Sequence, residues 1–408
     1  MKDIVDNRII KNLFKLVLIA LFASGCARAM IRHAVPMDSV HKAQIPGMEN
    51  IRVLSNEPSD VFLNDFVKLL EQEQNNGFSF FNLKSDKTYS VLAISGGASN
   101  GAYGAGLLNG WSKSGSRPVF KIVTGISTGA IIAPFAFLGS AYDGQLKEVY
   151  TRYSTRDIAR RRSLIKAISG DSFASSKPLE NIIDRIFDQQ LIKRVAEEYA
   201  KGRRLYVGTT NLDAQQLTIW DMGKIASIGD DRALTLFRKV ILASSAIPGV
   251  FPPVYFDVEV DSKHYEEMHV DGGTTKQVFF LYDVLQGFEN ALKEKKIDLA
   301  RIKYKIYVIR NGYIDPIWKE VPDKLLSIAE RAIDTMTNAQ GLGDIYQLYD
   351  FTRMDKGDFN LAYIPSAHIS RAKELFDRDE MRSLFDLGFA EAVQGYHWKK
   401  SPMESDNK

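Results

Sequence analysis

Two strand–turn–helix units stand in succession between residues 89 and 138, and they limit the fold more than any other feature of the chain. In each unit a short apolar run, at 89–94 and at 119–123, leads into a glycine-containing turn and then into an apolar segment of helical length, at 102–111 and at 130–138. Strands that alternate with helices pair in parallel, and the helices cover both faces of the sheet. The sequence therefore predicts an α/β fold with a mainly parallel central sheet.

The overall composition is that of a folded globular protein. The chain has 408 residues, which allows one large domain or two to three ordinary ones. Hydrophobic residues make up 45% and charged residues 25%, so disorder and fibre are excluded for the whole chain. The net charge is +3, and four basic residues against two acidic ones fall before residue 16, so the remainder is almost neutral and does not indicate a nucleic-acid binder. One cysteine excludes an intrachain disulfide and a cysteine-rich zinc site, and the sequence predicts neither a metal nor a cofactor.

The N-terminal segment predicts export rather than a fold element. Basic residues up to Lys15 precede the apolar run 16–23, which is much shorter than the roughly 20 residues that span a bilayer. Cys26 follows soon after this run, a layout that resembles a bacterial lipoprotein signal. In that interpretation residues 1–25 are a signal peptide, the Cys26 thiol is lipidated, and the chain is anchored in the cell envelope. The alanine after the cysteine is typical of sorting to the outer membrane of a Gram-negative bacterium. Ordinary cleavage after Ala29 is the alternative.

The remainder of the chain divides into three parts. Residues 26–87 are a tether and an N-terminal accessory region, residues 88–395 are a catalytic domain, and residues 396–408 are a polar tail. The catalytic domain has its core at 88–285 and further elements at its C-terminal side. Apolar periodicity predicts these further strands and helices: strands at 205–209, 217–220, 304–309 and 359–364, and helices at 179–199, 323–337 and 379–393.

The turn after the second predicted strand carries the strongest chemical signal, a GxSxG sequence formed by Gly125, Ser127 and Gly129. Glycines two residues on either side of a serine let the backbone turn sharply and project the hydroxyl group. The serine also precedes a helix, whose free N–H groups and dipole favour negative charge that develops nearby. The pattern predicts that Ser127 is a nucleophile. A tight turn that merely needs small residues is the alternative.

The turn after the first predicted strand, residues 95–102, is also rich in small residues. Such residues let consecutive N–H groups face one anion, either the oxyanion of an acyl-transfer intermediate or a nucleotide phosphate. The phosphate interpretation is the weaker one, because no Gly-Lys-Ser/Thr follows and the GxGxxG spacing is absent from this loop. The oxyanion interpretation assigns the donors to Gly96, Gly97 and Ala98, with Gly101 supporting the loop.

A serine nucleophile needs a base, and histidine is the default expectation. None of the six histidines has a persuasive sequence setting. Asp271 is the other candidate, because it follows a strand-like stretch and precedes Gly272 and Gly273. A carboxylate whose pKa is raised by burial can take the proton of a hydroxyl group within hydrogen-bond reach. An Asp-Gly pair by itself is usually a turn.

Together the three motifs resemble the patatin-like phospholipase family, in the same chain order. The resemblance rests on the loop 96–101, on GxSxG at 125–129 and on Asp271-Gly272, with support from residues 210–213 and 243–253. It implies a three-layer α/β/α fold and a Ser127–Asp271 dyad with neither a catalytic histidine nor a cofactor. It also implies a serine acyl hydrolase of the phospholipase A type, whose partner is a lipid or phospholipid substrate. The lipid anchor expected on Cys26 adds a membrane as the second partner.

The glycine loop departs from the pattern of that family at two positions. Ala98 stands where the third glycine is usual, and Asn100 stands where a basic residue is often found. Thr274 and Thr275 also replace the Asn-Pro pair that follows the acid in many relatives. Oxyanion stabilisation would therefore rely on backbone donors alone.

Two rival functions remain open from the sequence. The first is an α/β-hydrolase esterase with a Ser-His-Asp triad, in which His368 or His397 would be the base. The second is a lipoprotein that keeps the fold as a catalytically inactive binding module, which the changes at Ala98 and Asn100 allow.

Overall fold

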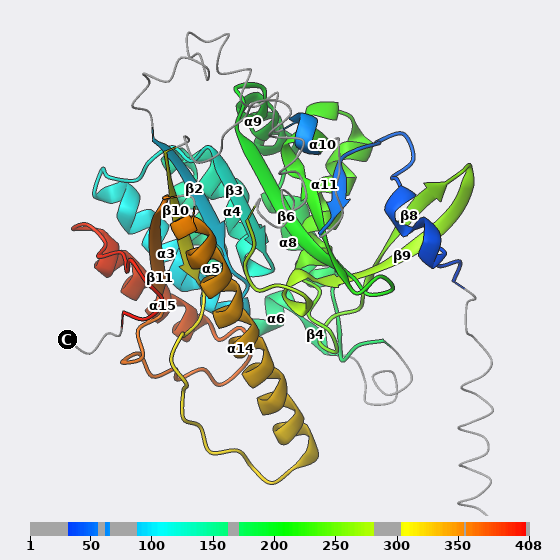
Figure 1. Ribbon diagram of the computed structural model, residues 1–408. Helices are drawn as coiled ribbons and strands as arrows, with labels where there is room; N and C mark the ends of the chain where they lie inside the picture. The colour runs from blue at the N-terminus through cyan, green and yellow to red at the C-terminus, as the bar shows by residue number, and fades with distance from the viewer. Residues whose placement is uncertain are drawn as a thin grey trace, which may run out of the picture.

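The computed structural model describes residues 32–55, 62–65, 88–161, 171–280, 303–354 and 356–404. The predicted signal peptide and Cys26 lie outside these residues. The described residues form one mixed sheet of nine strands with helices on both faces (Figure 1). This arrangement confirms the predicted three-layer α/β/α fold with a mainly parallel sheet.

Five parallel strands form the centre of the sheet. Their order across it is β6, β3, β2, β10 and β11. Because they are parallel, their carboxyl ends lie along one side of the sheet, which we call the carboxyl edge; ligand sites of open α/β sheets form at such an edge. The bounds of these strands are β2 (Tyr89–Ile94), β3 (Ile122–Ile126), β6 (Arg204–Asn211), β10 (Tyr304–Arg310) and β11 (Asp358–Tyr363).

Antiparallel strands extend the sheet beyond β6. β7 (Gln216–Asp221) pairs with β6, and β1 (Arg52–Leu54) pairs with β7. β9 (Lys263–Asp271) pairs with the last part of β6 and forms a hairpin with β8 (Val254–Val260). Two further strands, β4 (Arg160–Arg161) and β5 (Ala174–Ser175), pair only with each other.

The N-terminal accessory region is part of this sheet through β1. Arg52 of β1 forms a buried ion pair with Glu267 of β9 and donates to the carbonyl oxygen of Ala43 at 2.9 Å. Burying both charges is costly unless they are paired. The pair therefore joins the accessory region to the strand that ends at Asp271.

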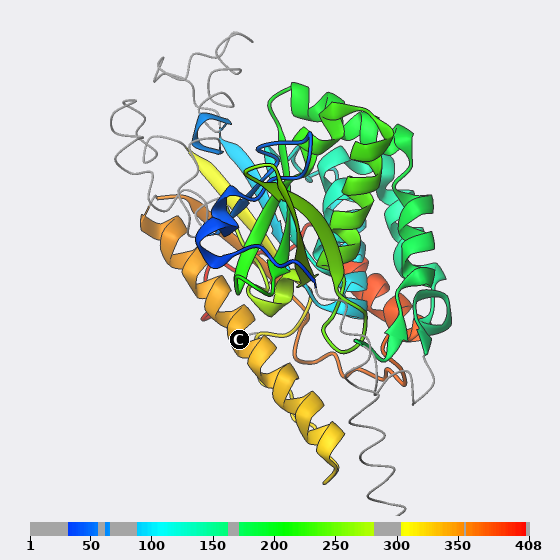
Figure 2. The ribbon, with the colours of Figure 1, turned by 90° about the vertical axis from the view of Figure 1, so that its right-hand side faces the viewer.

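Alternate residues of a strand face opposite sides of a sheet, so the sheet has two apolar cores. Leu92 and Ile94 of β2 face the core that most helices cover, whereas Val91 and Ala93 face the core that α14 covers. Figure 2 shows the orange α14 on one face and the green helices on the other. The bounds of the helices are α3 (Gly101–Lys113), α4 (Thr128–Leu138), α5 (Asp143–Arg152), α6 (Thr155–Ile158), α8 (Lys177–Ile186), α9 (Gln189–Ala200), α10 (Met222–Ile228), α11 (Asp231–Ser244), α14 (Leu325–Met354) and α15 (Arg378–Ala392).

Two helices differ from the sequence expectation. The segment predicted as one helix at 179–199 forms both α8 and α9, because the Asp188 carboxylate accepts from the N–H of Leu191 at 2.8 Å and caps a new helix. The helix predicted at 323–337 continues to Met354, since its second half packs against the sheet.

The end of the chain also differs from the expected polar tail. Lys399 pairs with Leu361 of β11, and Trp398 packs against Trp111 and Tyr307. Residues 396–399 are therefore part of the fold. Among the described helices, none combines the length and the apolar composition that crossing a bilayer requires.

Candidate active site

Ser127 lies in the sharp turn between β3 and α4, and its backbone is strained. Its φ of 56° and ψ of −122° lie in a region that non-glycine residues rarely occupy. The turn is tight because Gly129 has no side chain: a Cβ there would lie 2.3 Å from the carbonyl oxygen of Ile94. The N–H of Ser127 donates to the hydroxyl oxygen of Ser244 at 2.9 Å, which holds the strained residue in place. The strand–turn–helix context predicted for Ser127 is present.

Asp271 ends β9 opposite Thr209 of β6, and its carboxyl group hydrogen-bonds to the side chain of Ser127. It also accepts from the N–H of Gly273 at 2.8 Å. Burial raises the pKa of Asp271 to about 7, and the hydrogen bonds from Ser127 and Gly273 offset this only in part. A carboxyl group with such a pKa is present in both protonation states near neutral pH, which suits a general base.

The glycine loop after β2 offers two backbone donors rather than the predicted three. The N–H of Gly96 donates to the carbonyl oxygen of Gln277 at 2.9 Å, so the expectation that it holds the oxyanion is wrong. Within the described part of the chain, no acceptor is assigned to the N–H of Gly97 or Ala98. Ala98 lines the pocket that contains Ser127, which places this pair of donors beside the nucleophile.

The other motif glycines lie where the backbone comes close to a neighbour. Gly101 begins α3 beside Thr128, and Gly125 lies against the backbone of Gly129. Gly272 packs on the backbone of β6, and Gly273 follows it in the short turn after Asp271. These positions therefore support the turns around Ser127 and Asp271.

Asn311, which the sequence analysis did not single out, fixes the start of the glycine loop. Its backbone N–H donates to the hydroxyl oxygen of Ser95 at 2.8 Å, and its side-chain amide donates to the carbonyl oxygen of Ser95 at 2.9 Å. Its Oδ1 accepts from the N–H of Gly104 at 3.2 Å. Asn311 follows directly after β10, which is the neighbour of β2. The available signals were its position at the end of a predicted strand and the glycine that follows it.

Gln277 and Arg310 form a second support, which sequence reasoning also missed. The side-chain amide of Gln277 donates to the carbonyl oxygen of Gly273 at 2.7 Å. Arg310 donates to Gln277 Oε1 at 3.3 Å and to Asn338 Oδ1 of α14 at 3.1 Å. Burial lowers the pKa of Arg310 to about 10, and the nearby Asp344 carboxylate opposes this change. The guanidinium group thus links the Asp271 turn to α14.

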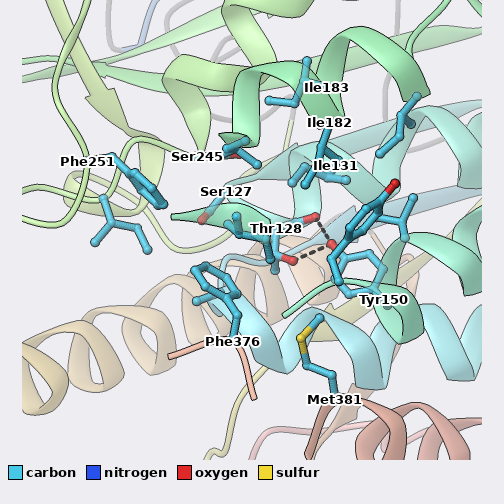
Figure 3. Close-up of a pocket in the computed structure, with 17 residues that line it drawn as sticks. Ser127, Thr128, Ile131, Tyr150, Ile182, Ile183, Ser245, Phe251, Phe376 and Met381 are labelled. Atoms are coloured by element: carbon cyan, nitrogen blue, oxygen red, sulfur yellow. Dashed lines mark hydrogen bonds between the residues drawn. The ribbon is translucent and has the colours of Figure 1, made fainter. Parts of the chain in front are cut away.

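The pocket beside Ser127 is apolar. Ile131, Ile182, Phe251, Phe376 and Met381 line it, as Figure 3 shows. Two phenols also line the pocket, and both hydroxyl groups are occupied: Arg185 donates to that of Tyr153 at 3.5 Å. Tyr150 donates to the carbonyl oxygen of Thr128 at 3.0 Å and shares a hydrogen bond with the Thr128 hydroxyl at 2.5 Å. The walls therefore suit a hydrocarbon chain better than a charged group.

Two histidines have side-chain partners other than Ser127 and Asp271. His368 shares a hydrogen bond with Glu380 at 2.9 Å. His269 is buried between Thr209 and Glu267, at 2.8 and 3.1 Å, and burial lowers its pKa. Across the described ranges no hydrogen bond joins a histidine to Ser127 or Asp271, and no three His, Cys, Asp or Glu side chains are grouped as a metal site would require.

Part of the chain matches a known protein family. Residues 92–282 match the family model of patatin-like phospholipases. Over this range the chain is similar to patatin-like phospholipases. Among solved structures, the crystal structure of VipD from Legionella pneumophila is similar to the chain, with 10% sequence identity and a TM-score of 0.33. The similarity covers 74% of this chain and 68% of that one. No curated protein matches the chain.

The patatin-like range contains Ser127, Asp271 and the whole glycine loop, but it ends before β10. Arg310, Asn311 and α14 therefore support the site from outside that range. The similarity to this family suggests hydrolase activity on lipids.

Proposed function

We propose that the protein is a lipid acyl hydrolase of the phospholipase A type that uses Ser127 as nucleophile and Asp271 as general base. The observation that carries the proposal is the hydrogen bond between these two side chains, beside an apolar pocket. Similarity to the patatin-like family over residues 92–282 supports the same reaction class.

The first half of the reaction forms an acyl-enzyme. Asp271 accepts the proton of the Ser127 hydroxyl while its oxygen attacks the ester carbonyl carbon, which gives a tetrahedral intermediate with a negative oxygen. The free N–H groups of Gly97 and Ala98 are the donors for this oxyanion. The intermediate collapses as the ester C–O bond breaks, and the leaving alkoxide takes the proton back from Asp271.

The second half releases the fatty acid. Asp271 accepts a proton from a water molecule, whose oxygen attacks the acyl carbon. The bond to Ser127 breaks, and the proton on Asp271 returns to the serine oxygen. The raised pKa of Asp271 suits both directions of transfer, because the group gains and loses a proton at little cost near pH 7.

The walls of the pocket favour an aliphatic acyl chain as the group transferred. Ile182, Phe376 and Met381 offer no hydrogen bonds, and the polar groups of Thr128 and Tyr150 are bonded to each other. A substrate with a long acyl chain gains from leaving water for this pocket, at about 0.8 kcal/mol per buried methylene group. We expect activity on short-chain esters to rise with chain length.

A serine-reactive fluorophosphonate probe tests the proposal. The wild-type protein should be labelled and should hydrolyse a p-nitrophenyl acyl ester, whereas Ser127→Ala should lose both properties and keep its folded state by circular dichroism. His368→Ala and His397→Ala are the matched variants, and both should keep at least half of the wild-type rate. Loss of turnover in either folded histidine variant would establish the histidine-dependent triad instead. An unlabelled, inactive wild-type protein would identify a binding module.

We also propose that the protein is exported and anchored in the outer membrane through a lipid on Cys26. The support is the sequence alone, namely the apolar run 16–23 followed by the single cysteine. Metabolic labelling with a palmitate analogue should mark the wild-type protein and not Cys26→Ala. Labelling that persists in the variant would contradict the anchor, and Ser127→Ala serves as the control because it keeps the N-terminal segment.

A further inference from the structure

The first half of α14 extends beyond the carboxyl edge of the sheet. Gly341, near the middle of the helix, lies against the guanidinium group of Arg310, the last residue of β10. Residues 325–340 therefore lie past the end of that strand, over about 24 Å at 1.5 Å per residue. Both views show this half of α14 projecting from the body of the molecule (Figures 1 and 2). We call residues 325–340 the overhang.

The overhang is an amphipathic helix that exposes its apolar side and turns its polar side toward the protein. Leu325, Ile328 and Met336 recur at helical spacing on one side and are exposed, at 83%, 50% and 63%. The opposite side carries Ser327 and Arg331, which are half-buried. A surface helix of a water-soluble protein normally buries its apolar stripe, so an outward stripe marks a surface that contacts something other than water.

Arg331 holds the overhang in this orientation. Its guanidinium group donates to the carbonyl oxygen of Ile317, in the segment that leads from β10 to α14. The polar side of the helix is thereby turned toward the protein, and the apolar stripe is turned away from it. The same segment carries Trp318, which is 86% exposed.

Further exposed apolar side chains follow β11, the neighbour of β10. The loop after β11 runs beside the segment that leads to the overhang, because the N–H of Ile364 donates to Gly312 and Tyr313 donates to His368. This loop exposes Ile369 and Leu375. Leu375 directly precedes Phe376, which lines the Ser127 pocket. The exposed apolar residues and the pocket are thus at the same edge of the sheet.

The charges around the stripe favour an apolar interface over an electrostatic one. Between residues 313 and 340 there are three basic residues against five acidic ones. Polybasic clusters are what draws a protein to anionic lipid, so this surface does not fit an anionic membrane. Exposed tryptophan, leucine and isoleucine instead suit the boundary between headgroups and acyl chains of a neutral bilayer.

The length of chain before the described structure also favours a membrane. Arg32, the first described residue, follows Cys26 by six positions. Six extended residues reach about 20 Å. An acyl group on Cys26, as proposed above, would hold this domain within that distance of the bilayer, where the overhang can meet it.

We propose that the overhang, with Trp318, is a docking surface for a zwitterionic phospholipid bilayer and seats the mouth of the Ser127 pocket on the lipid. The inference rests on the proposed function, because it assumes that the acyl chains entering the pocket come from that bilayer. Docking would shorten the path of an acyl chain from the lipid to Ser127 by keeping the carboxyl edge against the membrane.

The test uses full-length protein reconstituted in phosphatidylcholine vesicles. Vesicles that contain dibrominated phosphatidylcholine should quench the emission of Trp318, and Trp318→Phe identifies its share of the signal. The double variant Ile328→Asp/Met336→Asp should lose this quenching and at least tenfold of vesicle hydrolysis, while its rate on a soluble short-chain ester stays unchanged. Both side chains are exposed, so the variant should fold. Met354→Asp is the matched control, because Met354 is 69% exposed at the opposite end of the same helix.

Three results would overturn the docking surface. The first is a double variant that keeps both quenching and vesicle hydrolysis. The second is equal loss in Met354→Asp. The third is a wild-type dimer, measured by light scattering, that becomes a monomer in the double variant, since a second copy would then cover the stripe. Failure of the proposed function looks different: the wild type would hydrolyse neither substrate, while quenching would still report docking.

Discussion

The charge on Asp271 should set the pH dependence of the reaction at the scale of single residues. Because burial raises its pKa from 3.8 to about 7, the carboxylate that accepts the Ser127 proton forms only as pH rises through that value. We expect the rate on a soluble ester to climb between pH 5 and 8 with a midpoint near 7. Asp271→Asn should lower kcat by about 100-fold to 10,000-fold. A wild-type rate that is flat from pH 5 to 8 would contradict this role.

Gly97 is the position where a single methyl group should disable the oxyanion loop. Its φ of 152° is unfavourable for a residue with a side chain, and an added Cβ would lie 1.9 Å from the carbonyl oxygen of Asn311. Gly97→Ala must therefore displace the loop and its free N–H groups. We expect kcat to fall by about 100-fold to 1,000-fold, as when one oxyanion donor is lost.

Gly115 provides the control for that change. It also has a positive φ, 75°, but no atom lies within 4 Å of the position of its Cβ. Gly115→Ala should cost about 1 kcal/mol of stability in denaturant unfolding and leave kcat unchanged. Equal kcat values in the two variants would show that Gly97 and Ala98 do not provide the donors.

Arg310 is where three elements meet: β10 itself, α14 through Asn338, and the turn after β9 through Gln277. Arg310→Met should leave Gln277 Oε1 and Asn338 Oδ1 without a donor, at about 1 to 3 kcal/mol for each group. Chemical denaturation should therefore show a loss of about 3 kcal/mol, and kcat should fall because the Asp271 turn loses its support. Arg353→Met is an exposed change on α14, and its free energy of unfolding should stay within about 0.5 kcal/mol of wild type. Equal losses in the two variants would refute the bridge.

The residues of the candidate site show how much of it could be predicted from the sequence. Ser127, Asp271 and the glycine loop each follow a strand and carry their own local glycine signal, so their chemistry can be read from neighbouring residues. Asn311 also follows a strand and precedes Gly312, but this local signal does not identify its partner. Asn311 reaches Ser95, 216 positions away, only because β10 pairs with β2, and strand order is a long-range property of the sheet. The Gly96 donor was assigned wrongly for the same reason, since its acceptor is the distant Gln277.

The lengths of two helices were also hard to predict, because they depend on contacts that the local sequence pattern does not show. Residues 323–337 have the spacing of a helix, but the continuation of α14 to Met354 depends on Ile345 and Leu348 packing against the sheet. The opposite error occurred at Asp188, where a local cap divides an apolar pattern that reads as one helix. Tertiary contacts extend one helix, and a single capping hydrogen bond starts a new helix within the other segment.

At the scale of the whole molecule, two buried carboxyl groups make stability depend on pH. Asp221 ends β7 and resembles Asp271 in this respect, because burial raises its pKa to about 7 and the charge of Asp65 adds to the effect. Arg204 and the N–H of Lys224 oppose the shift only in part. In the unfolded chain each group has a pKa near 3.8. The folded state therefore binds the proton more tightly, and each group contributes stability that is present at low pH and lost as pH rises through about 7.

We expect the free energy of unfolding to fall by about 3 kcal/mol per group between pH 5 and pH 8.5, as measured by urea titration at the two values. Asp221→Asn should remove about 3 kcal/mol of this decrease, because asparagine still caps α10 but does not ionise. Buried His269, whose pKa is lowered, acts in the opposite direction and does so equally in both proteins. Glu267 does not disturb the comparison: its pKa is lowered to about 2, so the stability it contributes is lost only below the pH range measured. Equal slopes in wild type and Asp221→Asn would mean that Asp221 is already ionised in the folded protein at pH 5, and that Arg204 outweighs the cost of its burial.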